Sequence, residues 1–107
     1  MKIDEITPAE LATLVREGEP WQILDVREPW ELGIVSLEQA MAIPMAEIPM
    51  RHAELDRRRP IAVLCHSGMR SLRVAGYLCR LGFERVANVT GGIDAWAVEV
   101  DSSLPRY

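Results

Sequence analysis

The stretch Val63-Leu64-Cys65-His66-Ser67-Gly68-Met69-Arg70-Ser71 decides how this sequence is interpreted. The apolar residues 61–64 predict a buried strand that ends at Cys65, and the apolar periodicity of residues 70–81 predicts a helix. A short loop with one glycine joins the two. Backbone N–H groups and the positive end of the helix dipole then surround the sulfur. They would stabilise a thiolate together with Arg70, and they could also hold an anion.

Strands and helices alternate around this stretch, which predicts an α/β fold with a parallel sheet. Thr7 and Glu10 form a capping-box pattern with Pro8 between them, so a helix begins there and runs towards Gly18. The remaining elements that we expect are strands at 21–24, 40–43 and 86–89 and helices from Pro29, over 46–56 and from 92 through Trp96.

The polar segments that follow three of these strands predict one shared pocket. Residues 25–28, Cys65 and residues 90–92 all come directly after a strand. Ligands of open α/β sheets bind at the carboxyl ends of the strands, where these segments would meet.

Length and composition predict one domain over residues 1–107, with 49% hydrophobic residues to build a single core. Charged residues interrupt every apolar run, so we expect no membrane span, and the N-terminus lacks the apolar region of a signal peptide. A net charge of −4 argues against nucleic acid as a partner. Two cysteines without metal-ligand spacing favour a reducing, cytoplasmic setting and no metal site.

Three motifs follow one another along the chain: Leu24-Asp25-Val26-Arg27-Glu28-Pro29-Trp30-Glu31, the cysteine loop 65–71 and Val89-Thr90-Gly91-Gly92-Ile93-Asp94-Ala95-Trp96. In this order they make the chain resemble the rhodanese-like domain family of sulfurtransferases. The resemblance covers nearly the whole chain and implies a central parallel sheet of about five strands with helices on both faces. Four residues separate Cys65 from Arg70, as in sulfur-transferring members, whereas related phosphatases and arsenate reductases have one more. The turn that many members carry before the third strand is replaced by residues 34–40, which lack its histidine and glycine.

The resemblance implies that Cys65 is a nucleophile that takes sulfur from a small anionic donor such as thiosulfate, or from a protein persulfide. The resulting persulfide passes its sulfur to a thiophilic acceptor, either a small molecule or a protein. The resemblance thus implies a reaction in two displacement steps without a cofactor. The residues expected to hold the donor and the persulfide are His66, Ser67, Gly68, Met69, Arg70 and Ser71.

Several residues keep two interpretations at this stage. Arg70 either binds the anionic donor or forms an ion pair with Glu31 or Asp25. The resemblance implies mainly a structural role for Asp25 and Arg27, which would brace neighbouring loops in support of the site; their charges near a strand end also allow a catalytic role. Cys79 falls with Leu72, Ala75 and Gly76 on the apolar stripe of its helix, so we expect a buried, inert thiol; the alternative is a resolving cysteine that pairs with Cys65.

Two other functions stay open. A phosphatase or arsenate reductase also uses a cysteine in an anion-binding loop, although the short loop and the lack of an evident acid for the leaving group count against it. A persulfide carrier or interaction module with little turnover of free donors would have the same loop.

Overall fold

The computed structural model describes residues 2–107 and contains one five-stranded sheet in which every neighbouring pair of strands is parallel. The strands are β1 (Ile3–Ile6), β2 (Gln22–Asp25), β3 (Ala40–Ala42), β4 (Ile61–Leu64) and β5 (Val86–Val89). They lie in the order β1-β5-β4-β2-β3. Because the strands are parallel, their carboxyl ends meet at one edge of the sheet. The expected α/β fold with a central parallel sheet is therefore confirmed.

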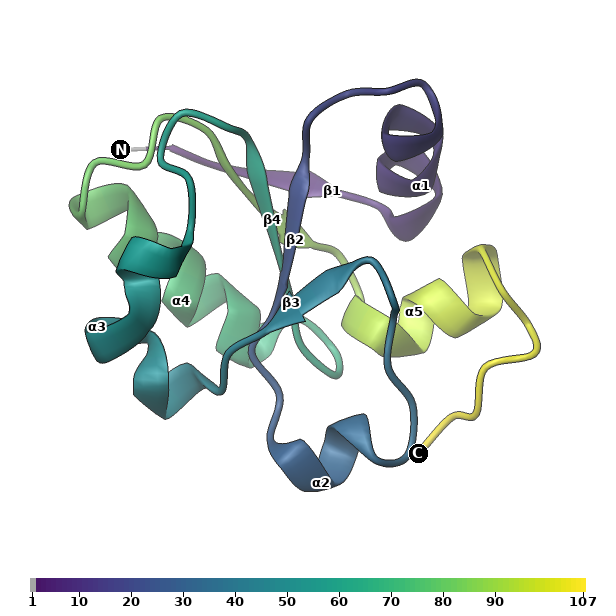
Figure 1. The fold of residues 1–107 in the computed structure, drawn as a ribbon. Helices are drawn as coiled ribbons and strands as arrows, with labels where there is room; N and C mark the ends of the chain where they lie inside the picture. The colour runs from purple at the N-terminus through teal and green to yellow at the C-terminus, as the bar shows by residue number, and fades with distance from the viewer. Residues whose placement is uncertain (1) are drawn as a thin grey trace.

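Helices cover both faces of this sheet, as Figure 1 shows. The helices are α1 (Pro8–Arg16), α2 (Pro29–Leu32), α3 (Ile48–Arg51), α4 (Met69–Arg80) and α5 (Gly92–Glu99). The α1 and α5 helices lie together on one face, and α3 and α4 lie on the other. The short α2 follows β2 at the carboxyl edge of the sheet, close to the C-terminus of the chain.

The sheet separates two apolar clusters, one on each face. Leu24 and Val63 pack with Leu78 of α4, whereas Leu64 packs with Ile93 of α5. Neighbouring residues of β4 therefore belong to opposite clusters, as the period of two in a strand requires. A strand buried on both faces needs apolar residues at every position, which explains why β4 reads as a continuous apolar run.

The first strand comes from a segment that the sequence pattern did not mark as a strand. Residues Ile3–Ile6 pair with Val86–Val89 of β5 along the edge of the sheet. Asp4 and Glu5 interrupt the apolar pattern there. An edge strand tolerates such charges, which also discourage pairing with another chain.

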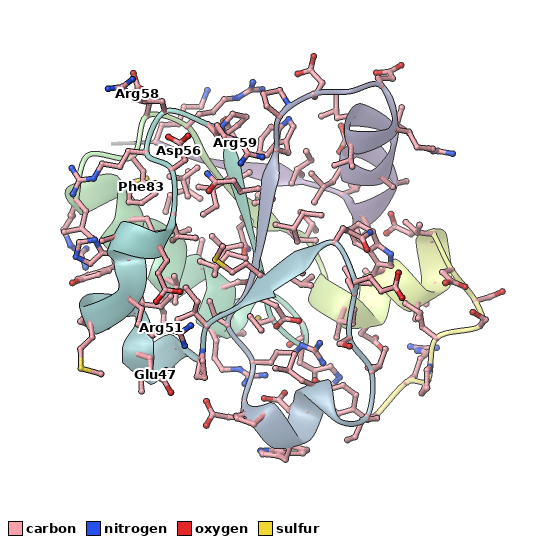
Figure 2. The ribbon with its side chains drawn as sticks, viewed as in Figure 1. Glu47, Arg51, Asp56, Arg58, Arg59 and Phe83 are labelled. Carbon is pink, nitrogen blue, oxygen red and sulfur yellow. The ribbon has the colours of Figure 1, made fainter. Side chains whose placement is uncertain are left out.

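The helix predicted over residues 46–56 is wrong, because the segment is broken into short pieces. Single 3-10 turns at Met45–Glu47 and His52–Glu54 flank the four-residue α3. Pro49 accounts for the break, because its ring nitrogen cannot donate to a preceding carbonyl and the ring crowds the previous turn. Arg51 connects these short pieces, because it forms ion pairs with Glu47 at 2.9 Å and with Glu54 at 2.8 Å. Figure 2 shows Glu47 and Arg51 side by side.

The face that α4 turns to the sheet matches the predicted stripe in part, because Ala75 is buried and Cys79 packs against the core, whereas Leu72 does not. Its buried residues are Ser71, Val74, Ala75 and Leu78. Leu72 is 43% exposed, and Cys79 is partly buried rather than fully buried. Ser71, which the stripe did not include, is buried, and its hydroxyl lies 3.2 Å from the Cys65 sulfur.

Candidate active site

Cys65 follows the last residue of β4 and lies at the carboxyl edge of the sheet. Its side chain is 1% exposed. The Gly68 N–H donates to the sulfur over 3.1 Å, and this approach needs a residue with a φ of +113°. Only glycine adopts that backbone conformation without strain, so Gly68 allows the loop to curl around the sulfur.

The sulfur also lies at the start of α4, which begins at Met69. The unpaired N–H groups of a helix N-terminus carry a partial positive charge and favour an anion nearby. Ser71, in the first turn, places its hydroxyl oxygen 3.2 Å from the sulfur. The Gly68 N–H and the start of α4 can therefore stabilise negative charge on Cys65 or on an atom bound to it.

Backbone N–H groups at the N-terminus of α5 bind the carbonyl oxygens of the cysteine loop. The Ile93 N–H donates to the Cys65 carbonyl at 2.8 Å, and the Asp94 N–H donates to the His66 carbonyl at 3.2 Å. Within a peptide unit the N–H points opposite to the C=O. The N–H groups of His66 and Ser67 therefore point away from α5. Residues 90–92 and Cys65, which follow different strands, are brought together as the sequence predicted.

Arg70 forms an ion pair with Glu31, one of its two expected partners. Its two terminal nitrogens lie 2.6 and 2.7 Å from the two Glu31 oxygens, in the parallel geometry typical of strong arginine–carboxylate pairs. These bonds hold the pKa of Glu31 at about 2, below its ordinary 4.5, although burial acts in the opposite direction. The Arg70 side chain is 30% exposed, so part of its guanidinium faces solvent beside the loop.

Asp25 and Arg27 form a fully buried ion pair beneath the neighbouring loops. The Arg27 side chain donates to Asp25 at 2.7 Å and to the Val35 carbonyl at 2.8 Å. These contacts link the end of β2 to residues 34–40. The altered turn is thus anchored by its backbone to Arg27.

Two residues of the site, Tyr107 and Asn88, are absent from the prediction made from the sequence. Tyr107 stacks on the His66 ring with centroids 4.1 Å apart, and its hydroxyl donates to Glu31 at 2.8 Å. Asn88 accepts a hydrogen bond from Ser71. Its position as the polar residue of an otherwise apolar strand was the available clue.

The remaining loop side chains lie toward solvent. Met69 is 75% exposed, Ser67 is exposed and His66 is half-buried under Tyr107. A cavity of about 410 Å³ opens beside the loop and is lined by His66, Ser67, Asp94, Arg106 and Tyr107. A larger one of about 760 Å³ lies between α1 and α5 and is lined by none of the predicted site residues.

Within residues 2–107, no group of three or more His, Cys, Asp or Glu side chains is placed to hold a metal ion. None of the helices described there is long and apolar enough to cross a membrane.

Comparison with known proteins agrees with this geometry. The model of the rhodanese-like domain family matches residues 7–99. A sulfurtransferase of Allochromatium vinosum is 35% identical over 95 residues, which are 89% of each chain. Among crystal structures, a rhodanese-like domain protein of Staphylococcus aureus is 32% identical, with a TM-score of 0.84 over 98% of this chain and 99% of that one. A rhodanese-related protein of Thermoplasma volcanium is 34% identical, with a TM-score of 0.81 over 91% and 93%.

The parallel sheet and the cysteine loop define a rhodanese-type α/β protein, and the chain belongs to the rhodanese-like domain family. Its similarity to the A. vinosum protein across almost all of both chains places it among the rhodanese-like sulfurtransferases.

Proposed function

We propose that the protein moves a sulfane sulfur from thiosulfate, or from a persulfide donor, to a thiophilic acceptor through a persulfide on Cys65. The observation that carries this proposal is the placement of the sulfur, enclosed by a loop that donates the Gly68 N–H to it at the start of α4. A group bound to that sulfur lies where positive partial charges converge.

The reaction consists of two displacements at sulfur. In the first, the Cys65 thiolate attacks the outer sulfur of thiosulfate and forms a new S–S bond. The S–S bond of thiosulfate breaks, and sulfite leaves with the bonding electron pair. In the second, cyanide or an acceptor thiolate attacks the outer sulfur of the persulfide, and Cys65 departs as thiolate. Neither step requires an oxidant or a reductant.

The residues of the site have different roles in this mechanism. The N–H groups from His66 to Ser71 hold the anionic outer sulfur. Arg70, kept in place by Glu31, supplies a positive charge at the rim for the donor. Asp25 and Arg27 keep the neighbouring loops in position. Four intervening residues make a small cradle, which suits one sulfur atom better than a tetrahedral phosphate group.

We further propose that the protein works as one domain over residues 1–107 in the cytoplasm, with small anionic donors or protein persulfide partners. Cys65 and Cys79 are both free thiols in the structure. A reducing compartment would keep the nucleophile available.

Intact mass spectrometry before and after treatment with thiosulfate tests the proposal. We expect the wild type to gain one sulfur atom, Cys65→Ser to gain none, and cyanide to reverse the gain. Cys79→Ser is the matched control, because it removes the other thiol and should still load. Loading by a cysteine desulfurase but not by thiosulfate would favour the persulfide carrier. Retention of loading in Cys65→Ser would exclude the mechanism.

A further inference from the structure

A chain of polar side chains runs from Cys65 to the edge strand β1, beneath the loop that holds the sulfur. The Ser71 hydroxyl lies 3.2 Å from the sulfur and donates to Asn88 Oδ1. Asn88 Nδ2 donates to the carboxylate of Glu5 at 3.2 Å. Ser71 and Asn88 are buried, so water does not substitute for these partners. The transfer reaction described above does not use Asn88 or Glu5.

The orientation of the Asn88 amide follows from its neighbours. Its nitrogen faces the two carboxylate oxygens of Glu5, at 3.2 and 3.4 Å, and the Gly68 carbonyl oxygen at 3.3 Å. All three atoms accept hydrogen bonds, and an ionised carboxylate has no proton to donate. A flipped amide would place its oxygen against them. The amide oxygen therefore faces Ser71 and can only accept from it.

This orientation decides where the Ser71 proton lies. A hydroxyl has one proton and two lone pairs. Since the proton points to Asn88, a lone pair points to the sulfur. We propose that Glu5 and Asn88 are positioning residues that set the direction of the Ser71 hydroxyl, so that it accepts a hydrogen bond from the resting Cys65 thiol.

The chain of hydrogen bonds therefore keeps Cys65 as a resting thiol until the Ser71 hydroxyl changes direction. A thiolate at Cys65 receives the Gly68 N–H on one side but meets an oxygen lone pair on the other. Ser71 can donate to the sulfur only by giving up its bond to Asn88. Because hydrogen bonds in a connected chain reinforce one another, the Glu5 carboxylate strengthens the resting arrangement from the far end. A resting cysteine held in this way reacts slowly with electrophiles and oxidants that do not enter through the donor site.

The test uses protein that carries Cys79→Ser, so that Cys65 is the sole thiol. The S–H stretching band in the Raman spectrum reports whether the thiol donates a hydrogen bond. We expect a band lowered from the free-thiol position, and a return toward that position in Asn88→Leu. Alkylation by iodoacetamide at neutral pH should become about tenfold faster in Asn88→Leu, because the freed hydroxyl can donate to the thiolate.

Three further variants separate hydroxyl direction from packing. Ser71→Ala removes the acceptor itself, so the S–H band should return toward the free-thiol position, and an unchanged band would contradict the proposal. Glu5→Gln removes the ionic acceptor at an exposed position and should accelerate alkylation by a smaller factor. Gln22→Leu is the matched control, because it removes an amide that bonds to Asp56 at the opposite end of the sheet. It should change neither readout.

The proposal is overturned if Asn88→Leu and Glu5→Gln alkylate no faster than their parent, or if Gln22→Leu accelerates alkylation as much as they do. Should Asn88→Leu fail to fold, the alkylation rate of Glu5→Gln and the S–H band of Ser71→Ala still test the proposal. The inference rests on the proposed function only for its effect on sulfur transfer. Absence of persulfide loading together with the expected alkylation pattern would count against the proposed function alone.

Discussion

Glu31 accepts two hydrogen bonds from Arg70, of 2.6 and 2.7 Å, although the two residues are 39 positions apart in the chain. Arg70 lies in the first turn of α4, where a positive side chain opposes the helix dipole. The Glu31 carboxylate offsets that repulsion and fixes the guanidinium beside the cysteine loop. One pair of residues thus joins α2 to α4 and keeps a cation at the rim of the site.

The pair predicts a specific acid response for Glu31→Gln. The folded pKa of Glu31, about 2, lies below its ordinary 4.5, so the carboxylate stabilises the fold above pH 4.5 and loses this contribution as pH falls toward 2. The contribution is about 3 kcal/mol at neutral pH. In urea unfolding from pH 7 to pH 2, the difference between wild type and Glu31→Gln should therefore shrink as pH decreases.

Glu54→Gln is the control for this experiment, because Glu54 also pairs with an arginine, Arg51, but on the surface. Exposed ion pairs contribute little to stability. A pH response of Glu54→Gln as large as that of Glu31→Gln would show that the acid response does not depend on the buried position of Glu31.

Tyr107 connects several parts of the site, and two substitutions separate its contacts. Tyr107→Phe keeps the stack on His66 but removes the hydroxyl, which donates to Glu31 and accepts from Arg27 at 3.1 Å. We expect a loss of about 1 to 2 kcal/mol in the free energy of unfolding, because buried polar groups lose a partner. Persulfide loading should be nearly unchanged.

Tyr107→Ala removes the stack as well and should also raise the KM for thiosulfate, since His66 and the rim of the loop lose their support. Chemical denaturation and steady-state kinetics on both variants test these expectations. Equal KM values for the two variants would show that the ring does not position the loop.

The sequence predicted those features whose causes lie close together along the chain. Thr7 and Glu10 form the expected capping box, with both hydrogen bonds in place, because the two partners are three residues apart. The four strands predicted from apolar runs are present, and β4 ends at Leu64, so that Cys65 follows it directly.

The features that the sequence could not predict depend on partners far apart in the chain. Asn88 and Glu5 are separated by 83 positions, and Tyr107 and Glu31 by 76. Their meeting follows from strand order and from the path of the C-terminal segment, neither of which leaves a local pattern. On α4, the apolar stripe predicts the burial of Ala75 but not that of Ser71. Ser71 faces the core because Asn88, 17 positions away, supplies a buried partner.

Cys79→Ser should change stability more than function. Burial raises the pKa of the Cys79 thiol, so at neutral pH it is a weaker nucleophile than an exposed cysteine. Serine replaces a partly buried sulfur with a more polar oxygen, and we expect a cost of about 1 kcal/mol in the free energy of unfolding. Thiosulfate loading, followed by intact mass, should proceed at the wild-type rate. A selective loss of loading with an unchanged unfolding curve would give Cys79 a role in transfer.

Gly92→Ala should disrupt the cysteine loop, whereas Gly18→Ala should cause only local strain. Both glycines have positive φ, +60° at Gly92 and +87° at Gly18. A Cβ at Gly92 would lie 2.4 Å from the carbonyl oxygens of both Cys65 and His66, but one at Gly18 would meet nothing within 4 Å.

Gly18→Ala therefore reports the backbone strain alone, about 1 kcal/mol in the free energy of unfolding, with normal persulfide loading. Gly92→Ala must also push the loop away from α5 and break the bonds from Ile93 and Asp94 that orient it. We expect at least a tenfold slower loading by thiosulfate and a loss of about 3 kcal/mol or more, since backbone atoms cannot move aside as a flexible side chain can. Intact mass spectrometry of samples quenched at successive times, together with urea unfolding, measures these effects in both variants. Normal loading in a folded Gly92→Ala protein would show that the contact with α5 does not hold the loop in its active shape.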